Sequence, residues 1–418
     1  MHSPPDGSLP ALVLDAVLRQ SLVAVRSLGR AGIAVHVAES AAGAPAFASR
    51  WCADRIVLPD LVTDPGAYVD RILELCSRLG HPVVIASHDG TIDALRSRRA
   101  EVEQVAELAL APEAAMSAAV DKRSTLAVAE QLGLHIPPGV TVSEPTDAAA
   151  AVDAIGVPVV IKPAVSWVDG RTAAWRAAPM LARERDQAIG QVSRLTGDGV
   201  AALLQRWLPG AREAVSTLYA NGSMAAIFAQ RAERMSPLLG GTSVLRESIP
   251  VPDDIGGMSV RLIRELSLEG YAEVEFRRDA DGRPFLMEIN PRLSASVEIA
   301  VRSGVDFPLL LYRWAASLPL GAPPGYRVGR RMRFLGGDIA WLKEALRDPA
   351  HPDAPPPKTA IGTFAAEFAR FPGYDFWDAR DPAPAAVVAS HVARSLPPRI
   401  ARALRHRLRD ADLVGEAT

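Results

Sequence analysis

The chain has 418 residues, of which 49% are hydrophobic and 22% are charged, and its formal net charge is −2. This is the balance of a globular protein with a substantial core and roughly two or three domains. No basic block is present to suggest a nucleic-acid partner. The two cysteines are too few for a disulfide framework, the first residues lack a signal-peptide pattern, and no apolar run reaches the about 20 residues of a membrane span. We expect a cytoplasmic protein without a membrane partner.

The first 114 residues alternate predicted strands with predicted helices. Strands are expected at 11–14, 33–38, 55–58 and 82–86, and helices at 19–30 and 65–79. This alternation is typical of a parallel sheet with crossover helices, and no GxGxxG motif follows the first strand to suggest a dinucleotide site. Ser87, His88 and Asp89 follow the last of these strands, where open α/β sheets bind ligands. A polar turn in which Asp89 caps the next helix is an equal alternative.

Lysine is rare in this chain, with four lysines at 122, 162, 343 and 358 among 46 basic residues. Because arginine is the default basic residue, a lysine indicates a position where a compact ammonium group is wanted. Lys122 opens a helix expected at 121–132, and Lys162 ends an apolar strand expected at 157–163. A buried ammonium is costly unless it meets an anion, which favours a phosphate partner. The alternative is that Lys162 extends its ammonium into water.

The middle of the chain combines strands, one loop and one helix. The expected elements are a strand at 202–208, a hairpin with strands at 213–220 and 223–230, a mobile polar loop at 166–176 and an amphipathic helix at 253–268. Asn221-Gly222 is the expected hairpin turn, and counting outward from it places Glu213 opposite Gln230.

A second hairpin is the centre of the functional prediction. Its strands are expected at 272–276 and 285–292, and Asp281-Gly282 is a strong signal for a two-residue turn between them. That turn places Glu275 directly opposite Glu288, with their Cβ atoms roughly 4.5 to 5.5 Å apart.

Two facing carboxylates repel each other unless a cation lies between them. Asn290 and Arg292 follow Glu288 on the same face of the strand. An oxygen-rich set beside an amide suits Mg²⁺ that carries phosphates. The alternative is a surface ladder of solvated charges, but the apolar flanking residues favour a hairpin that is buried on its other face.

Beyond Arg292, helices are expected at 296–304 and 307–318. From about residue 321, Pro-rich joins separate short amphipathic pieces, and the last piece is an Arg-rich helix expected at 398–410. A Walker-type GxxxxGK[ST] loop is absent. Cations on separate elements, paired carboxylates and a fixed arginine are nevertheless the groups that phosphoryl transfer requires.

The order of these motifs resembles the ATP-grasp superfamily, and specifically its uncharacterised carboxylate–amine ligase-like members. The resemblance spans roughly residues 115–320 and depends on Asp121-Lys122, VVIKP at 159–163, LLQRWLPG at 203–210, VEF at 274–276 and MEINPR at 287–292. Each motif alone is a weak signal, but all of them in this order are a specific one.

The resemblance implies an α/β and α+β fold. An N-terminal open parallel α/β sheet at 1–114 would precede a two-subdomain ATP-grasp fold, with the small subdomain at 115–200 and the large one at 201–320. A mostly helical C-terminal extension would follow at 321–418. ATP would lie between the two subdomains together with Mg²⁺, or with Mn²⁺ in its place.

The resemblance also implies individual roles. Lys122 and Lys162 would bind the ATP phosphates, and Arg292 would be the catalytic residue near the transferred phosphoryl group. The others are Gln205, Trp207 and Leu208 along the adenine, Glu213 near the ribose, and Glu275, Glu288 and Asn290 as metal ligands. The chain departs from many relatives at Arg206, where they have Glu, and in its loop at 166–176, which contains a single glycine.

The implied activity is the ligation of a small-molecule carboxylate to an amine. ATP would convert the carboxylate into an acyl phosphate, the amine would attack it, and ADP and phosphate would leave. The alternatives are a carboxylase-like or kinase-like ATP-grasp reaction and an ATP-binding regulatory protein without activity. No biotin-attachment motif is visible, which argues against carboxylation within this chain. A homodimer is a further expectation.

Overall fold

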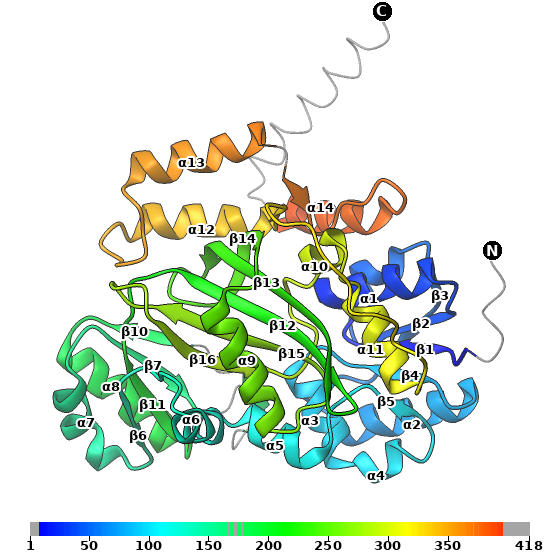
Figure 1. Cartoon of the computed structure of the whole chain (residues 1–418), viewed down its shortest axis with the longest axis horizontal. Helices are drawn as coiled ribbons and strands as arrows, with labels where there is room; N and C mark the ends of the chain where they lie inside the picture. Colours follow the sequence, from blue (N-terminus) through cyan, green and yellow to red (C-terminus); the bar gives the residue numbers. More distant parts are fainter. Residues whose placement is uncertain (1–7, 165–166, 170–173, 177–178, 371, 396–418) are drawn as a thin grey trace, which may run out of the picture.

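The computed structural model describes residues 8–164, 167–169, 174–176, 179–370 and 372–395. Figure 1 shows three larger sheets with helices around them, and the central sheet lies between the N-terminal sheet and a small sheet. Within the described ranges, no helix is both long and apolar enough to cross a membrane. The Arg-rich helix expected at 398–410 lies outside the described residues.

The N-terminal sheet is parallel throughout, as the alternating pattern predicts, with the strand order β3-β2-β1-β4-β5. Its strands are β1 (Ala11–Val13), β2 (Val35–Glu39), β3 (Cys52–Val57), β4 (Val83–Ile85) and β5 (Glu107–Leu108). Its helices are α1 (Arg19–Arg30), η1 (Pro45–Ala48), α2 (Pro65–Leu79), α3 (Asp89–Ser97) and α4 (Arg99–Val102). Helix α2 has its predicted limits because the Asp64 carboxylate accepts the Ala67 N–H at its start and Gly80 adopts a φ of 72° at its end.

The small sheet is antiparallel, with the strand order β10-β7-β11-β6. It follows α5 (Glu113–Val120) and α6 (Lys122–Gln131), and it comprises β6 (Gly139–Val142), β7 (Val159–Pro163), β10 (Met180–Ala182) and β11 (Ala202–Arg206). The helical segments η2 (Pro145–Asp147), α7 (Ala148–Ile155) and α8 (Arg185–Gly197) complete this part. Two short strands, β8 (Trp167–Asp169) and β9 (Ala174–Arg176), pair within the predicted mobile loop, whose remaining residues lie outside the described ranges.

The central sheet has the strand order β16-β15-β12-β13-β14-β17-β18. Its strands are β12 (Arg212–Ala220), β13 (Ser223–Ser236), β14 (Thr242–Ile249), β15 (Gly270–Arg278), β16 (Pro284–Asn290), β17 (Arg331–Arg333) and β18 (Gly373–Tyr374). The helices are α9 (Asp253–Glu265), α10 (Glu298–Ser303), α11 (Phe307–Ala315), α12 (Leu335–Arg347), α13 (Pro357–Ala369) and α14 (Ala383–Ser395). The C-terminal part is mostly helical, as expected, but it also adds β17 and β18 to this sheet, which the sequence did not reveal.

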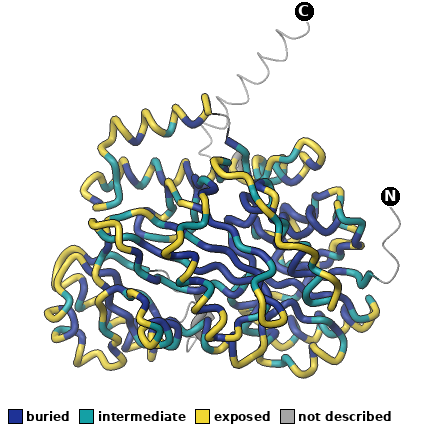
Figure 2. The backbone as a smooth tube through the Cα atoms, in the orientation of Figure 1, coloured by how far each residue is buried: buried dark blue, intermediate teal, exposed yellow. Residues whose placement is uncertain are grey.

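A continuous core connects the N-terminal sheet with the central sheet. Helix α11 packs against both α1 and β15. One buried apolar cluster accordingly contains Leu28 from α1, Phe228 from β13 and Leu311 from α11. Figure 2 shows the buried backbone running through the central sheet into the N-terminal part, whereas much of α13 is exposed. This shared core holds the N-terminal sheet against the central sheet.

The hairpin of β12 and β13 differs from its predicted register. Glu213 pairs with Arg231, and Ala214 pairs with Gln230, so the prediction that Glu213 lies opposite Gln230 is wrong. The pairing shifts between Leu218 and Tyr219, where a bulge inserts one extra residue into β13. Counting outward from a turn fails beyond a bulge, because the extra residue shifts every later pair by one position along the bulged strand.

The hairpin of β15 and β16 has the predicted carboxylate pair but a different turn. Glu275 lies opposite Glu288, as predicted. The loop is longer than two residues, since Arg278 already pairs with Pro284, and the Asp279 carboxylate accepts the Arg283 N–H within it. A bulge beside Glu275 restores the register. The predicted two-residue turn is therefore wrong, and the bulge compensates for that error.

Gly210, just before β12, lies against the backbone of this hairpin. Its N–H donates to the Arg278 carbonyl, and a Cβ atom at this position would meet that carbonyl oxygen at 2.5 Å. We expect Gly210→Ala to reduce the free energy of unfolding by about 1–3 kcal/mol, because backbone cannot give way as a side chain does. The exposed Gly190→Ala in α8, which would meet open space, is the matched control and should raise stability by up to about 1 kcal/mol. Urea unfolding of both variants measures the difference, and equal stability would contradict the predicted clash.

Candidate active site

A cavity of about 600 Å³ is lined by side chains from the small sheet, from the central sheet and from the segments that follow β1 and β4 of the N-terminal sheet. Except for Trp207, every residue with a predicted role lines it: Lys122, Lys162, Gln205, Leu208, Glu213, Glu275, Glu288, Asn290 and Arg292. The Trp207 indole N–H instead donates to Asp353 at 3.5 Å, and its ring centroid lies 5.3 Å from the guanidinium carbon of Arg277. The side chain of Trp207 therefore contacts Asp353 and Arg277 and does not line the cavity.

The carboxylates of Glu275 and Glu288 face the cavity from neighbouring strands. Burial, followed by repulsion from Glu288 and Glu273, raises the pKa of Glu275 to about 8. The amide Nδ2 of Asn290 donates to Glu275 Oε1 at 2.8 Å. Burial also acts to raise the pKa of Glu288, but the nearby positive charges of Lys122, Lys162 and Arg292 outweigh it and lower that pKa. The ionised form of Glu275 is therefore destabilised, whereas the ionised form of Glu288 is stabilised by nearby positive charges.

The two lysines lie beside these carboxylates in the cavity. The Lys122 ammonium is 3.4 Å from Glu288 Oε2, and its backbone N–H donates to the Ala164 carbonyl, which ties the start of α6 to the end of β7. Burial lowers the pKa of Lys162 to about 8, and the attraction of Glu288 offsets this only in part. Two ammonium groups from separate elements therefore converge on one part of the cavity, as a polyphosphate would require.

Gln205 provides unpaired hydrogen-bonding groups at another wall of the cavity. It is buried in β11, and neither its amide nitrogen nor its amide oxygen has a partner among the described residues. Its neighbour Leu204 faces the core of the small sheet, so alternation along the strand turns Gln205 to the cavity side. A buried amide with a free donor and a free acceptor fits the edge of a planar base.

Glu213 is buried, and both of its carboxylate oxygens are engaged. Oε1 accepts from Arg231 at 3.1 and 3.0 Å, and Oε2 accepts from Arg278 Nε at 2.7 Å. Arg206, at the departure from the resemblance, is exposed and also lines the cavity. The predicted acid near the ribose thus lies in the cavity wall, where it also orients two arginines.

The chemistry of the donor set fits a divalent cation that carries phosphates. In the described part of the chain, no three His, Cys, Asp or Glu side chains are arranged around a single metal position. Glu275, Glu288 and Asn290 supply two carboxylates and an amide, and Mg²⁺ typically takes one or two carboxylates and completes its shell with waters and phosphate oxygens. Burial and the charges of Glu288 and Glu273 outweigh the attraction of Arg212 and Lys162 and raise the pKa of Glu275, and a cation between the carboxylates would relieve this repulsion.

The structure adds functional residues that sequence reasoning missed. Glu273 is buried and accepts from Gln230 Nε2 at 2.9 Å and from Ser216 at 3.2 Å, and burial raises its pKa. It is two residues from Glu275 on the same strand face, which was the available signal. Arg212 lines the cavity, and burial followed by the charge of Arg277 lowers its pKa to about 10. Nothing in the sequence distinguishes Arg212 from the other arginines.

Asp89 joins the N-terminal sheet to the catalytic candidate. Arg292 Nε and Nη2 both donate to its carboxylate, the latter at 3.3 Å. Ser87, His88 and Asp89 line the cavity. The alternative in which Asp89 caps α3 is wrong, because His88 is the N-cap, Asp89 is the first helical residue, and no described side chain caps the helix. This ion pair holds the guanidinium of Arg292 beside the start of α3, just after the carboxyl end of β4.

Comparison with known proteins adds a family match. Residues 199–333 match the model of a family described as ATP-grasp in the biosynthetic pathway with Ter operon. The matched segment runs from β11 to β17 and contains the hairpin of Glu275 and Glu288.

Solved structures with similar folds include several ligases and carboxylases. N5-carboxyaminoimidazole synthetase from Staphylococcus aureus has a TM-score of 0.62 and 14% identity over 84% of this chain and 89% of that chain. The biotin carboxylase domain of 2-oxoglutarate carboxylase from Hydrogenobacter thermophilus, solved with MgADP and bicarbonate, has a TM-score of 0.62 and 14% identity over 78% and 73%. The L-amino acid ligase from Bacillus licheniformis has a TM-score of 0.57 and 17% identity over 78% of each chain. Residues 199–333 thus match an ATP-grasp family model, and the fold of the chain is similar to that of these ligases and carboxylases.

Proposed function

We propose that this protein is an ATP-dependent ligase that joins a small-molecule carboxylate to an amine through an acyl phosphate. The observation that carries the proposal is that Glu275 and Glu288 lie opposite each other on neighbouring strands, beside Lys122 and Lys162 in one cavity. Facing carboxylates and facing ammonium groups complement a metal and a polyphosphate, respectively.

Each residue has a role in this proposal. Lys122 and Lys162 bind phosphate oxygens, and Gln205 hydrogen-bonds the edge of the base. Glu275, Glu288 and Asn290 would hold Mg²⁺, or Mn²⁺, which when bound neutralises charge on the phosphates. The guanidinium of Arg292, oriented by Asp89, stabilises the negative charge on the phosphoryl group during transfer.

The reaction balances in two steps. A carboxylate oxygen of the acid attacks the γ-phosphorus, and the bond between that phosphorus and ADP breaks. The amine nitrogen then attacks the acyl carbon, the C–O bond to phosphate breaks, and the nitrogen loses a proton. The acyl phosphate is needed because a carboxylate is a poor electrophile and cannot expel oxide. Leu208 and Glu213 would support the base and sugar from the cavity wall, and Trp207 would support that wall from outside the cavity.

The known proteins with this fold support an ATP-dependent ligase in general terms. Their names include an L-amino acid ligase, which favours an amine as the second substrate. They also include a carboxylase solved with bicarbonate, in which the acid would be bicarbonate itself. Both reactions begin with ATP and a carboxylate, so the identity of the second substrate separates them.

The deciding experiment is a screen for ADP release. The protein is mixed with ATP, Mg²⁺ and an acid in the presence or absence of an amine, with amino acids and small peptides as both, and bicarbonate as a parallel acid. We expect ADP release that requires both substrates and a product whose mass equals their sum minus water. ADP release that bicarbonate alone stimulates would favour a carboxylase, and no stimulated release with any pair would contradict the ligase.

A further inference from the structure

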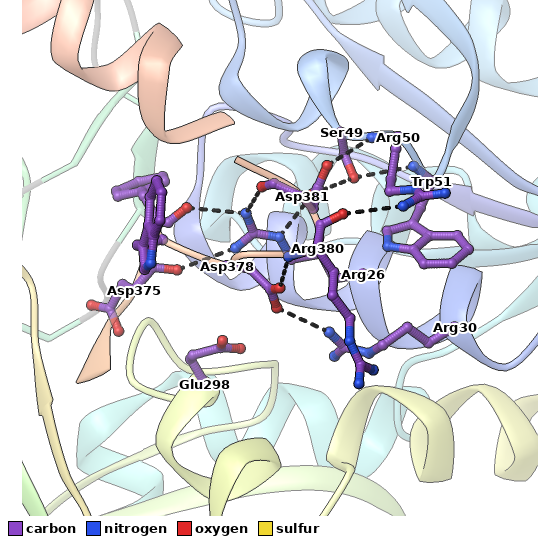
Figure 3. Close-up of polar contacts among 12 residues, drawn as sticks. Arg26, Arg30, Ser49, Arg50, Trp51, Glu298, Asp375, Asp378, Arg380 and Asp381 are labelled. Atoms are coloured by element: carbon purple, nitrogen blue, oxygen red, sulfur yellow. Dashed lines mark hydrogen bonds and ion pairs between the residues drawn. The ribbon is translucent and has the colours of Figure 1, made fainter. Parts of the chain in front are cut away.

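The C-terminal part of the chain reaches back to the cavity through residues 373–381, which we call the C-terminal strap. The strap begins as β18 beside β17, and its far end is anchored on the N-terminal sheet. Figure 3 shows this anchor: Arg26 Nε, the Ser49 hydroxyl and the Arg50 backbone N–H donate to the Asp381 carboxylate at 2.9, 2.8 and 2.8 Å. The strap therefore bridges the central sheet and the N-terminal sheet.

Asp375, in the middle of the strap, forms ion pairs with two arginines. Arg19 comes from α1 and Arg246 from β14. The exposed fractions are 7% for Arg19, 0% for Arg246 and 3% for Asp375. Two guanidinium groups and one carboxylate leave one excess positive charge in a buried site, which is costly without a further anion.

Only one of the two arginines reaches the cavity. Arg19 lines it, whereas Arg246 is not among its lining residues. Nη1 of Arg19 donates to Asp375, but its Nη2 is buried and has no hydrogen-bond partner among the described residues. Burial, despite the attraction of Asp375, lowers the pKa of Arg19 to about 10. A buried guanidinium nitrogen that lacks an acceptor within the described chain and belongs to a residue of the cavity wall is suited to an anion bound in the cavity.

The position of this guanidinium is well defined. Its Cζ lies 4.3 Å from the ring centroid of Phe334, so an aromatic face supports it while Asp375 orients it. The next residue, Gln20, donates to the Ser87 carbonyl at 3.4 Å, and Asp89 two residues on holds Arg292. Arg19 thus lies on the same wall as the catalytic candidate, set apart from it by the end of β4.

We propose that Arg19 binds a carboxylate group of one of the two substrates, away from the bond that is formed. The assignment of this anion to a substrate depends on the proposed ligase function, whereas the binding itself does not. The acid substrate would then carry a second carboxylate, or the amine would be an amino acid. Asp375 of the strap orients Arg19 for this contact. The C-terminal part therefore contributes to substrate selection, although Asp375 itself does not contact the substrate.

The test is equilibrium binding without ATP, measured by calorimetry at constant ionic strength on the full chain. Glutarate carries no amine and L-alanine carries one, so they separate the two sources of the carboxylate, and glutaramide and phosphate are measured beside them. We expect wild-type protein to bind one of the two carboxylates and Arg19→Gln to bind it at least about tenfold weaker, as for the loss of a charge-assisted hydrogen bond. Arg19→Gln should remain folded, because Asp375 keeps Arg246.

Asp375→Asn distinguishes an anion site from a purely structural ion pair. It removes the competing carboxylate but keeps both arginines, so the anion should bind at least as tightly as in wild type. A structural pair predicts the same loss in both variants. A melting temperature will show whether Asp375→Asn folds. If it does not, the carboxylate affinity of Arg19→Gln relative to wild type still tests the proposal. No saturable millimolar binding by wild type, equal affinity in Arg19→Gln, or Arg19-dependent preference for phosphate would each overturn the proposal. Failure of the ADP-release screen with Arg19-dependent binding intact would overturn the ligase reaction alone.

Discussion

Replacing Glu288 by Gln should reduce ADP release by roughly 10³-fold, the scale seen when one preorganised charge is removed from a reacting centre. Without this carboxylate, Glu275 and Asn290 cannot hold a metal in the geometry that phosphoryl transfer requires. Glu275→Gln should cause a comparable loss of turnover. A Glu288→Gln protein that turns over normally would show that this account of the cavity is wrong.

The same two substitutions should change metal-free stability in opposite directions. Repulsion between the carboxylates alone would make both changes stabilising. The lysines reverse the sign for Glu288: its pKa is lowered in the fold, so its ionised form stabilises the fold above its ordinary pKa, and Gln loses that contribution. The pKa of Glu275 is raised from 4.5 to about 8, so the wild-type fold loses stability as the pH rises through that window, and Gln removes the loss.

Melting temperatures in metal-free buffer across that pH range measure the contrast. At neutral pH, Glu275→Gln should melt above wild type and Glu288→Gln below it. Glu265→Gln at the exposed end of α9 is the matched control and should leave both activity and melting temperature unchanged. Equal shifts for the two hairpin variants would indicate a solvated surface ladder instead of a metal site.

Replacing Lys162 by Met should weaken ATP binding by about 10- to 100-fold, which corresponds to the loss of a charge-assisted hydrogen bond. The fold should tolerate the change. The pKa of Lys162 is lowered from 10.5 to about 8, so the wild-type fold loses stability as the pH falls from 10.5 to 8, because the Lys162 amine of the unfolded chain takes up a proton before that of the fold does. The Met variant therefore should melt above wild type at neutral pH.

Calorimetric titration with ATP measures this affinity, and Lys358→Met provides the control, since Lys358 is exposed on α13. Lys122→Met should behave like Lys162→Met for ATP, but it also removes the partner of Glu288. Unchanged ATP affinity in both cavity variants would contradict the assignment of phosphate oxygens to these lysines.

Local patterns in the sequence were sufficient for much of the fold. The alternating strands and helices predicted the parallel N-terminal sheet, and the helix expected at 65–79 matches α2 to the residue. The two predicted hairpins also form. Their registers were less certain, because bulges are invisible in a residue pattern: one bulge displaced Glu213, and another restored the pairing of Glu275 with Glu288.

The sequence by itself determined that two carboxylates and an asparagine would share one face of a hairpin, since strand alternation and turn residues are local properties. Tertiary structure alone decided which distant charges meet. Asp89 and Arg292 are 203 residues apart, and Arg19 and Asp375 are 356 residues apart. Such pairs depend on how α11 and the C-terminal strap pack the N-terminal sheet against the central sheet, and in a chain this rich in arginine no local pattern distinguishes the guanidinium groups that will be buried at a cavity from those that water will solvate.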